Sequence, residues 1–196
     1  PYIYQGEELG MTNRKCRDFS EFRDIEIKNA YHDFVEGGIL DEETMLKFVN
    51  AIGRDNARFP MHWDDSDNAG FTTGTPWISV NENYKKINAA AQVNDPDSIF
   101  SYYKKLIELR HQMEIIVYGV YKSKAIEHPD VFAYTRTLGD EKLFVVCNFR
   151  EQEMDFTLED GFTGDEKVLI SNYDDVVKTE NGIYLRPYEA KVFYRK

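Results

Sequence analysis

Cysteine is scarce in this chain. Cys16 and Cys147 are the only cysteines among 196 residues, and they are far apart, without the paired spacing of a zinc site or a small disulfide scaffold. We therefore expect free thiols in a reducing cytoplasm, and a fold that rests on hydrophobic packing rather than on cross-links.

Positive charge is also in short supply. The chain carries 24 lysines and arginines against 35 aspartates and glutamates, a formal net charge of −11. This balance argues against a polyanionic partner such as nucleic acid or an acidic membrane surface. No apolar run approaches the roughly 18 residues of a membrane span, and no signal peptide is present. We expect a neutral partner, with no nucleic acid and no membrane.

Histidines are few and dispersed, at positions 32, 62, 111 and 128. None of them forms a metal-ligand or acid/base cluster, so we expect no metal and no cofactor. What the chain does have is 42% hydrophobic residues, enough for one large domain or two small ones.

Helical signals dominate the first half of the chain. A short aromatic stretch at residues 2–5 is predicted as a buried strand, and residues 27–35 as helical. Residues 41–52 form a second predicted helix, with Asp41 as N-cap and Gly53 expected to end it in a left-handed turn. Asp95 begins a third, with an apolar stripe that includes Ile99.

Strand signals dominate the second half, because the apolar period changes to two beyond Ile115. We predict strands at 131–137, 142–149, 154–158, 167–171, 183–185 and 191–194. Together they indicate a small antiparallel sandwich. The change of period places a domain boundary near residues 112–118.

The most informative motif is Arg54-Asp55-Asn56-Ala57-Arg58, which follows the helix that ends near Gly53. Two arginines with a carboxylate between them can brace that carboxylate and donate bidentately to vicinal hydroxyls. In isolation, such a motif is more often a surface ion-pair cluster. Both tryptophans lie in the loop that follows, where their indoles could stack on a pyranose ring or simply anchor the loop.

Six ordered blocks of sequence resemble a known family. They are PYIYQGEELGM at 1–11, RDIE at 23–26, RDNARFPMHWDDSDNAGF at 54–71, TPWISVNENYKKIN at 75–88, DPDSIFSYYKKLIELR at 95–110 and VFAYTRTLGDEKLFVVCNF at 131–149. The chain resembles the carboxy-terminal part of the oligo-1,6-glucosidases, a subfamily of glycoside hydrolase family thirteen, the α-amylase family.

The resemblance implies an α/β segment followed by an all-β one. Residues 1–112 would be the last strand, long substrate-side loop and helix of a (β/α)₈ TIM barrel. Residues 113–196 would be the C-terminal antiparallel β-sandwich. Because the chain begins at Pro1 without an initiator methionine, we expect a longer parent protein.

The resemblance also implies retaining hydrolysis of short α-glucosides such as isomalto-oligosaccharides, by a nucleophilic carboxylate and an acid/base carboxylate. The motifs of both residues lie on earlier barrel strands and are missing here, so we assign no catalytic residue and expect this chain by itself to be inactive.

The resemblance also implies which residues of this chain contact the sugar. Arg54 matches the arginine at the first glucosyl unit, while Glu26 matches a carboxylate at the second sugar and Arg58 an arginine near it. Phe59 replaces the usual threonine and His62 the usual glutamine, which leaves the linkage preference open.

Two alternatives remain open. The chain is either part of an α-glucosidase for neutral α-linked oligosaccharides or a non-catalytic carbohydrate-binding or interaction module. In both cases a strand cut from a closed barrel leaves unpaired edges and an exposed apolar helix face. We therefore expect self-association, or a missing N-terminal barrel portion as a partner.

Overall fold

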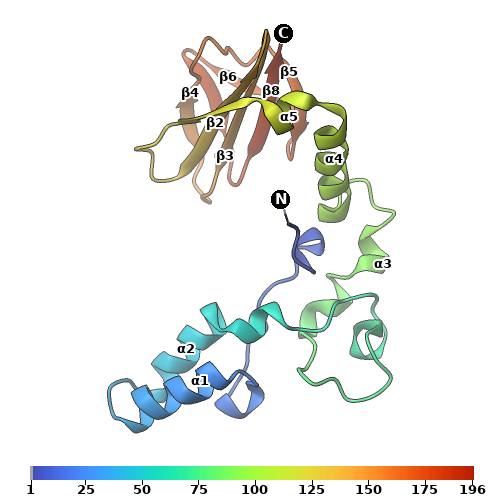
Figure 1. Cartoon of the computed structure of the whole chain (residues 1–196), viewed down its shortest axis with the longest axis vertical. Helices are drawn as coiled ribbons and strands as arrows, with labels where there is room; N and C mark the ends of the chain where they lie inside the picture. Colours follow the sequence, from blue (N-terminus) through green and yellow to red (C-terminus); the bar gives the residue numbers. More distant parts are fainter. Residues whose placement is uncertain (1) are drawn as a thin grey trace. The chain divides into compact units, whose positions relative to one another are not determined.

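The computed structural model describes residues 2–196 and falls into two compact units (Figure 1). One unit ends at Lys104, and the other runs from Lys105 to Lys196. The first is built from helices and loops, and the second mainly from strands, as the change of apolar period predicted. The border between the units falls inside helix α4 (Ile99–Gln112). The predicted domain border at residue 112 stays a prediction.

Short helices and turns make up the first unit. The α-helices are α1 (Ile25–Ala30), α2 (Glu42–Ile52), α3 (Ala89–Gln92) and the start of α4. The 3-10 turns are η1 (Glu7–Leu9), η2 (Phe19–Glu21), η4 (Arg54–Ala57), η5 (Asp67–Gly70) and η6 (Glu82–Lys85), and α1 continues into the π-helical segment η3 (Tyr31–Glu36). The predicted helices at 27–35 and 41–52 are confirmed.

Helices α1 and α2 lie side by side around a small core (Figure 1). Helix α2 begins where it does because Asp41 Oδ1 accepts a hydrogen bond from the Thr44 backbone N–H at 2.8 Å, which satisfies an amide that lacks a partner within the helix. The core consists of Cys16, Phe22, Ile27, Met45 and Val49.

The expected left-handed turn at Gly53 is wrong. Gly53 has φ −61° and ψ 140°, so the chain leaves α2 in an extended conformation. A glycine is required for a different reason, since a Cβ atom here would lie 2.4 Å from the backbone oxygen of Val49. Close approach of Gly53 to the last turn of α2, rather than a positive φ, explains the residue.

The strand predicted at residues 2–5 is also wrong for this chain. Tyr2, Ile3 and Tyr4 have no strand geometry and are largely exposed. A parallel barrel strand gains its hydrogen bonds from neighbours on both sides, and no strand formed by residues 2–196 pairs with this stretch. The sequence pattern is that of a strand, but the pairing that would create one is missing.

Two antiparallel sheets form most of the second unit and follow the short helix α5 (Glu114–Tyr118). The strands are β1 (Val120–Lys124), β2 (Val131–Leu138), β3 (Glu141–Asn148), β4 (Met154–Thr157), β5 (Lys167–Ser171), β6 (Val177–Thr179), β7 (Gly182–Leu185) and β8 (Ala190–Arg195). One sheet has the order β1-β2-β3-β8-β5, and the other β4-β7-β6. A shared core, including Phe144, Phe156 and Ile183, packs between them.

The sequence pattern located most of these strands. The β2–β3 hairpin turns at Gly139, whose φ of 57° suits glycine, with Leu138 opposite Glu141. Strands β1 and β6 were not predicted, because they lie mostly exposed at sheet edges and lack a buried apolar alternation. Helix α5 was missed because it is only five residues long and rich in β-branched side chains.

A buried charge cluster stabilises the connection between β7 and β8. Glu189 is 1% exposed and accepts hydrogen bonds from the backbone N–H of Arg186 at 2.8 Å and from its Nε at 3.0 Å. It also forms an ion pair with Lys191, which is buried as well. Each charge compensates another, as burial requires.

None of the helices formed by residues 2–196 has the length and apolar character that crossing a membrane requires.

Candidate functional site

Two segments far apart in the sequence meet in the first unit. One is the start of α1, where Asp24 is the N-cap and Glu26 occupies the first turn. Asp24 Oδ1 accepts a hydrogen bond from the Glu26 backbone N–H at 2.9 Å. The other is η4, which opens with Arg54 immediately after α2. The side chains of Glu26 and Arg54 are both exposed.

Asp55 joins these two segments. Its side chain is only 2% exposed, and Oδ2 accepts hydrogen bonds from the backbone N–H groups of Arg23 at 2.6 Å and Asp24 at 3.2 Å. Oδ1 accepts a hydrogen bond from the guanidinium of Arg58. Burial of a carboxylate is costly unless its oxygens are paired. The start of α1 and the turn η4 are therefore held together by a single well-paired side chain.

Arg58 completes this junction. Besides donating to Asp55, its Nη2 lies 3.0 Å from Oδ2 of Asp24, and its guanidinium lies over Trp77 at 5.5 Å from the ring centroid. Arg58 was expected near the second sugar, and its contact with a sugar stays a prediction. In this chain its guanidinium is engaged by two carboxylates and an aromatic face.

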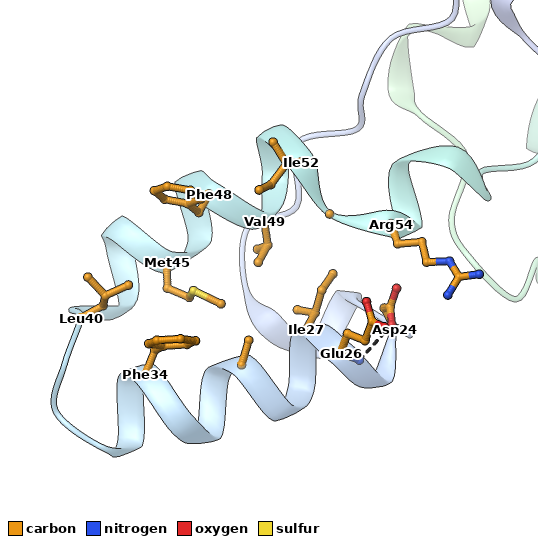
Figure 2. Close-up of a pocket in the computed structure, with 12 residues that line it drawn as sticks. Asp24, Glu26, Ile27, Phe34, Leu40, Met45, Phe48, Val49, Ile52 and Arg54 are labelled. Atoms are coloured by element: carbon orange, nitrogen blue, oxygen red, sulfur yellow. Dashed lines mark hydrogen bonds between the residues drawn. The ribbon is translucent and has the colours of Figure 1, made fainter.

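Glu26 and Arg54 line the same cavity, of about 400 Å³, between α1 and α2 (Figure 2). Together with Asp24 they form its polar end, and the other end is apolar (Figure 2). The apolar lining consists of Ile27, Ala30, Phe34, Leu40, Met45, Phe48, Val49 and Ile52. Because the Arg54 side chain has no hydrogen bond or ion pair within residues 2–196, its donors are free for a ligand.

Arg54 also lines a second cavity of about 400 Å³. Its lining is more polar and includes Gln5, Glu7, Asn13 and Asn56. Arg54 therefore belongs to the lining of both a mainly apolar and a more polar cavity. Hydroxyl-rich ligands suit such a position, because a planar guanidinium can donate to two neighbouring oxygens at once.

Glu7 and Glu8 hold their own loop. Glu8 Oε2 accepts a hydrogen bond from the Gly6 backbone N–H at 2.8 Å, and Glu7 Oε2 accepts one from the Tyr4 N–H at 3.3 Å. These two carboxylates therefore support the backbone of their own loop.

Trp63 lies at the start of a tight loop. Its backbone N–H donates to the Ala69 carbonyl at 2.9 Å, and Asn68 and Ala69 are both left-handed, with φ of 54° and 59°. Such angles are uncommon for residues other than glycine. Trp63 is 53% exposed and Trp77 is 63% exposed, so both indoles are accessible to a ligand, although the Arg58 guanidinium lies over the Trp77 ring.

The two departures from the family pattern both lie in the interior. Phe59 is 4% exposed and His62 has no exposed surface. His62 Nδ1 donates a hydrogen bond to the Ile87 carbonyl at 2.8 Å. Any effect of these residues on an outer sugar subsite would therefore act through loop packing.

Asp24 and Asp55 were not predicted as members of the site. A signal was available for each, since Asp55 lies between the two arginines of the motif and Asp24 stands two residues before Glu26, at a helix start. Within residues 2–196, no group of three or more His, Cys, Asp or Glu side chains is arranged to hold a metal ion. The site offers hydrogen-bonding groups suited to a neutral polyhydroxyl ligand.

Comparison with known proteins defines the class. Residues 1–119 match the model of the α-amylase catalytic domain, and residues 131–192 match that of the C-terminal domain of the α-amylase SusG. The chain belongs to the α-amylase family, with part of the catalytic domain followed by a C-terminal domain of antiparallel sheets.

Comparison with individual members of this family gives more specific similarities. The chain is 52% identical over 195 residues to the oligo-1,6-glucosidase of Parageobacillus thermoglucosidasius, covering 98% of this chain and 35% of that protein. The solved trehalose-6-phosphate hydrolase of Bacillus licheniformis is 46% identical, with a TM-score of 0.91, and the match covers 99% of this chain and 35% of that one. The isomaltulose synthase of Erwinia rhapontici is 44% identical, with the same TM-score and the same coverage.

These relatives are all much longer than this chain, which spans about a third of their length. The predicted resemblance to oligo-1,6-glucosidases, a group of glycoside hydrolases, is confirmed.

Proposed function

We propose that this chain supplies the carboxy-terminal part of a retaining α-glucosidase that hydrolyses short α-glucosides such as isomalto-oligosaccharides. The observation that carries the proposal is the meeting of Arg54 and Glu26 at one cavity, in a chain 52% identical to an oligo-1,6-glucosidase. The catalytic carboxylates would come from the earlier part of the barrel, so this chain by itself would be inactive.

The proposed contacts come from the family resemblance, and the cavity supports those of Arg54 and Glu26. Arg54, with its unengaged guanidinium, would donate to hydroxyls of the first glucosyl unit. Glu26 would accept hydrogen bonds from the second sugar, because it is exposed at the same end of the cavity (Figure 2). Arg58 would contribute at the edge of the second subsite.

We assign residues 1–112 to the barrel portion and residues 113–196 to a β-sandwich domain whose two sheets share one core. A cytoplasmic location is supported by the two free thiols of Cys16 and Cys147. The neutral oligosaccharide and a barrel portion, or a second copy of the chain, are the proposed partners.

Hydrolysis of p-nitrophenyl α-glucoside tests the proposal. We expect no nitrophenol release by the purified chain, and turnover when the chain is combined with the upstream part of an oligo-1,6-glucosidase. The upstream part measured by itself is the control. Turnover by this chain without a partner would show that the nucleophile and acid/base lie within it, contrary to the proposal.

The alternative function is that of a non-catalytic carbohydrate-binding or interaction module. It would be favoured if the combined proteins stayed inactive while the chain bound isomaltose in a calorimetric titration.

A further inference from the structure

The contacts of Asp55 connect the two residues proposed to bind the two sugars, and they therefore bear on substrate selectivity. Asp55 follows Arg54 directly, and the two backbone amides that it accepts, those of Arg23 and Asp24, come just before Glu26. One buried carboxylate thus links the residue proposed for the first sugar to the residue proposed for the second.

Neither of those two residues is restrained through its own side chain. Glu26 and Arg54 are exposed, and neither side chain has a hydrogen bond or ion pair with another part of residues 2–196. Their separation is therefore set by the backbone segments that carry them. Those segments are connected to each other through Asp55, and through Arg58, which contacts both Asp24 and Asp55.

We infer that Asp55 is a positioning residue which, together with Arg58, fixes the distance between Glu26 and Arg54 and so selects substrates that occupy both sugar subsites. The inference rests on the proposed function. A disaccharide needs both contacts at once, whereas an aryl glucoside needs only Arg54. Weakening the contacts of Asp55 should therefore lower the activity on the disaccharide more than the activity on the aryl glucoside, because misplaced binding groups lose much of their effect.

Asp55→Asn is the variant of choice, because it preserves the shape of the side chain. In the wild-type chain, Oδ2 accepts hydrogen bonds from the two backbone amides, and Oδ1 accepts one from the Arg58 guanidinium. An asparagine has only one acceptor oxygen, so its NH₂ group must face either the backbone amides or the guanidinium. Asp140→Asn, at an exposed position in the β2–β3 turn, is the matched control.

The first measurement uses the chain as it is. Hydrogen exchange followed by NMR should show faster exchange of the Arg23 and Asp24 amides in Asp55→Asn, with the β3 amides unchanged and the Asp140→Asn variant like the wild type. Unchanged exchange of both amides would overturn the junction itself.

The second measurement uses the active assembly of chain and upstream barrel portion. The ratio of kcat/KM for isomaltose to kcat/KM for p-nitrophenyl α-glucoside should fall roughly tenfold to a hundredfold in Asp55→Asn, mostly through the KM of isomaltose. Glu26→Gln should lower the same ratio. Arg58→Lys keeps the positive charge but loses the planar guanidinium, so its ratio should lie between those of the wild type and Asp55→Asn.

Failure of the inference is distinguishable from failure of the proposed function. Equal losses on the two substrates would mean that Asp55 only supports the fold, and would overturn its role in selectivity. An inactive wild-type assembly would refute the proposed function, and with it the selectivity role, before any variant is compared.

Discussion

His62 lies inside the long loop of the first unit, with no exposed surface. Its Nδ1 donates to the Ile87 carbonyl, and its ring meets Tyr84 edge to face, with centroids 6.2 Å apart. Nε2 is buried and has no hydrogen-bond partner within residues 2–196. Burial lowers the pKa of this histidine below its ordinary value of 6.5, since a charged ring would lose its hydration here.

Stability of the first unit should therefore depend on pH through His62. Below about pH 6.5, His62 binds a proton in the unfolded chain but not in the folded chain. The free energy of unfolding should therefore fall as pH falls. Urea unfolding between pH 5 and 8, followed by the fluorescence of Trp63 and Trp77, measures this.

The pH dependence should largely disappear in His62→Gln and persist in His111→Gln, where the histidine is exposed on α4. An unchanged slope in His62→Gln would contradict the prediction.

At the scale of an element, Gly53 shows how the end of α2 leads to Arg54. The chain leaves the helix extended, and Gly53 donates its N–H to the Val49 carbonyl at 2.8 Å. A side chain at this position would meet that carbonyl oxygen, and Ile27 Cδ1 at 3.0 Å. The backbone must pass this close for Arg54 to reach the cavity.

Gly53→Ala should consequently destabilise the chain by about 1–3 kcal/mol, the usual cost of overpacking. Gly74→Ala is a matched control, because its φ is not positive and the nearest atom to an added Cβ lies 3.8 Å away. The control should be neutral or slightly stabilising, since alanine restricts the unfolded chain. Denaturant midpoints of the two variants provide the test, and equal midpoints would speak against a close approach at Gly53.

At the scale of the whole molecule, a large amount of apolar surface stays exposed. Along α4, Ile99 is 47% exposed, Leu106 39% and Ile107 42%. The helix has the apolar stripe that the sequence predicted, yet it has no buried residue. Exposed apolar surface of this kind usually marks a contact with another protein surface.

We predict that the isolated chain self-associates, and that Ile107→Lys lowers the association constant by roughly tenfold, in line with the burial energy of one aliphatic side chain. Sedimentation velocity over a range of concentrations measures it. Glu108→Lys, the next residue on the same helix, is the control for charge and should have little effect. A monomer at all concentrations would contradict the prediction.

Much of the fold could be read from local patterns. Asp41 and the apolar spacing of Met45 and Val49 located α2, because a helix buries one face at intervals of three and four residues. The same reasoning located α4 and the β2–β3 hairpin. The proposed sugar-contacting pair, Arg54 and Glu26, came instead from the family resemblance, and both residues line one cavity in the structure.

Contacts between distant residues could not be read in this way. Nothing in the neighbourhood of Asp55 reveals that its Oδ2 accepts hydrogen bonds from amides 31 and 32 residues away. Nothing around Glu189 reveals a buried charge compensated by Arg186 and Lys191. Likewise, residues 2–5 have a strand pattern without a strand. Periodicity and capping depend on neighbours in sequence, so local pattern determined the helices and the hairpin, whereas burial, pairing and compensation of charge depend on neighbours in space, and only the tertiary structure decided them.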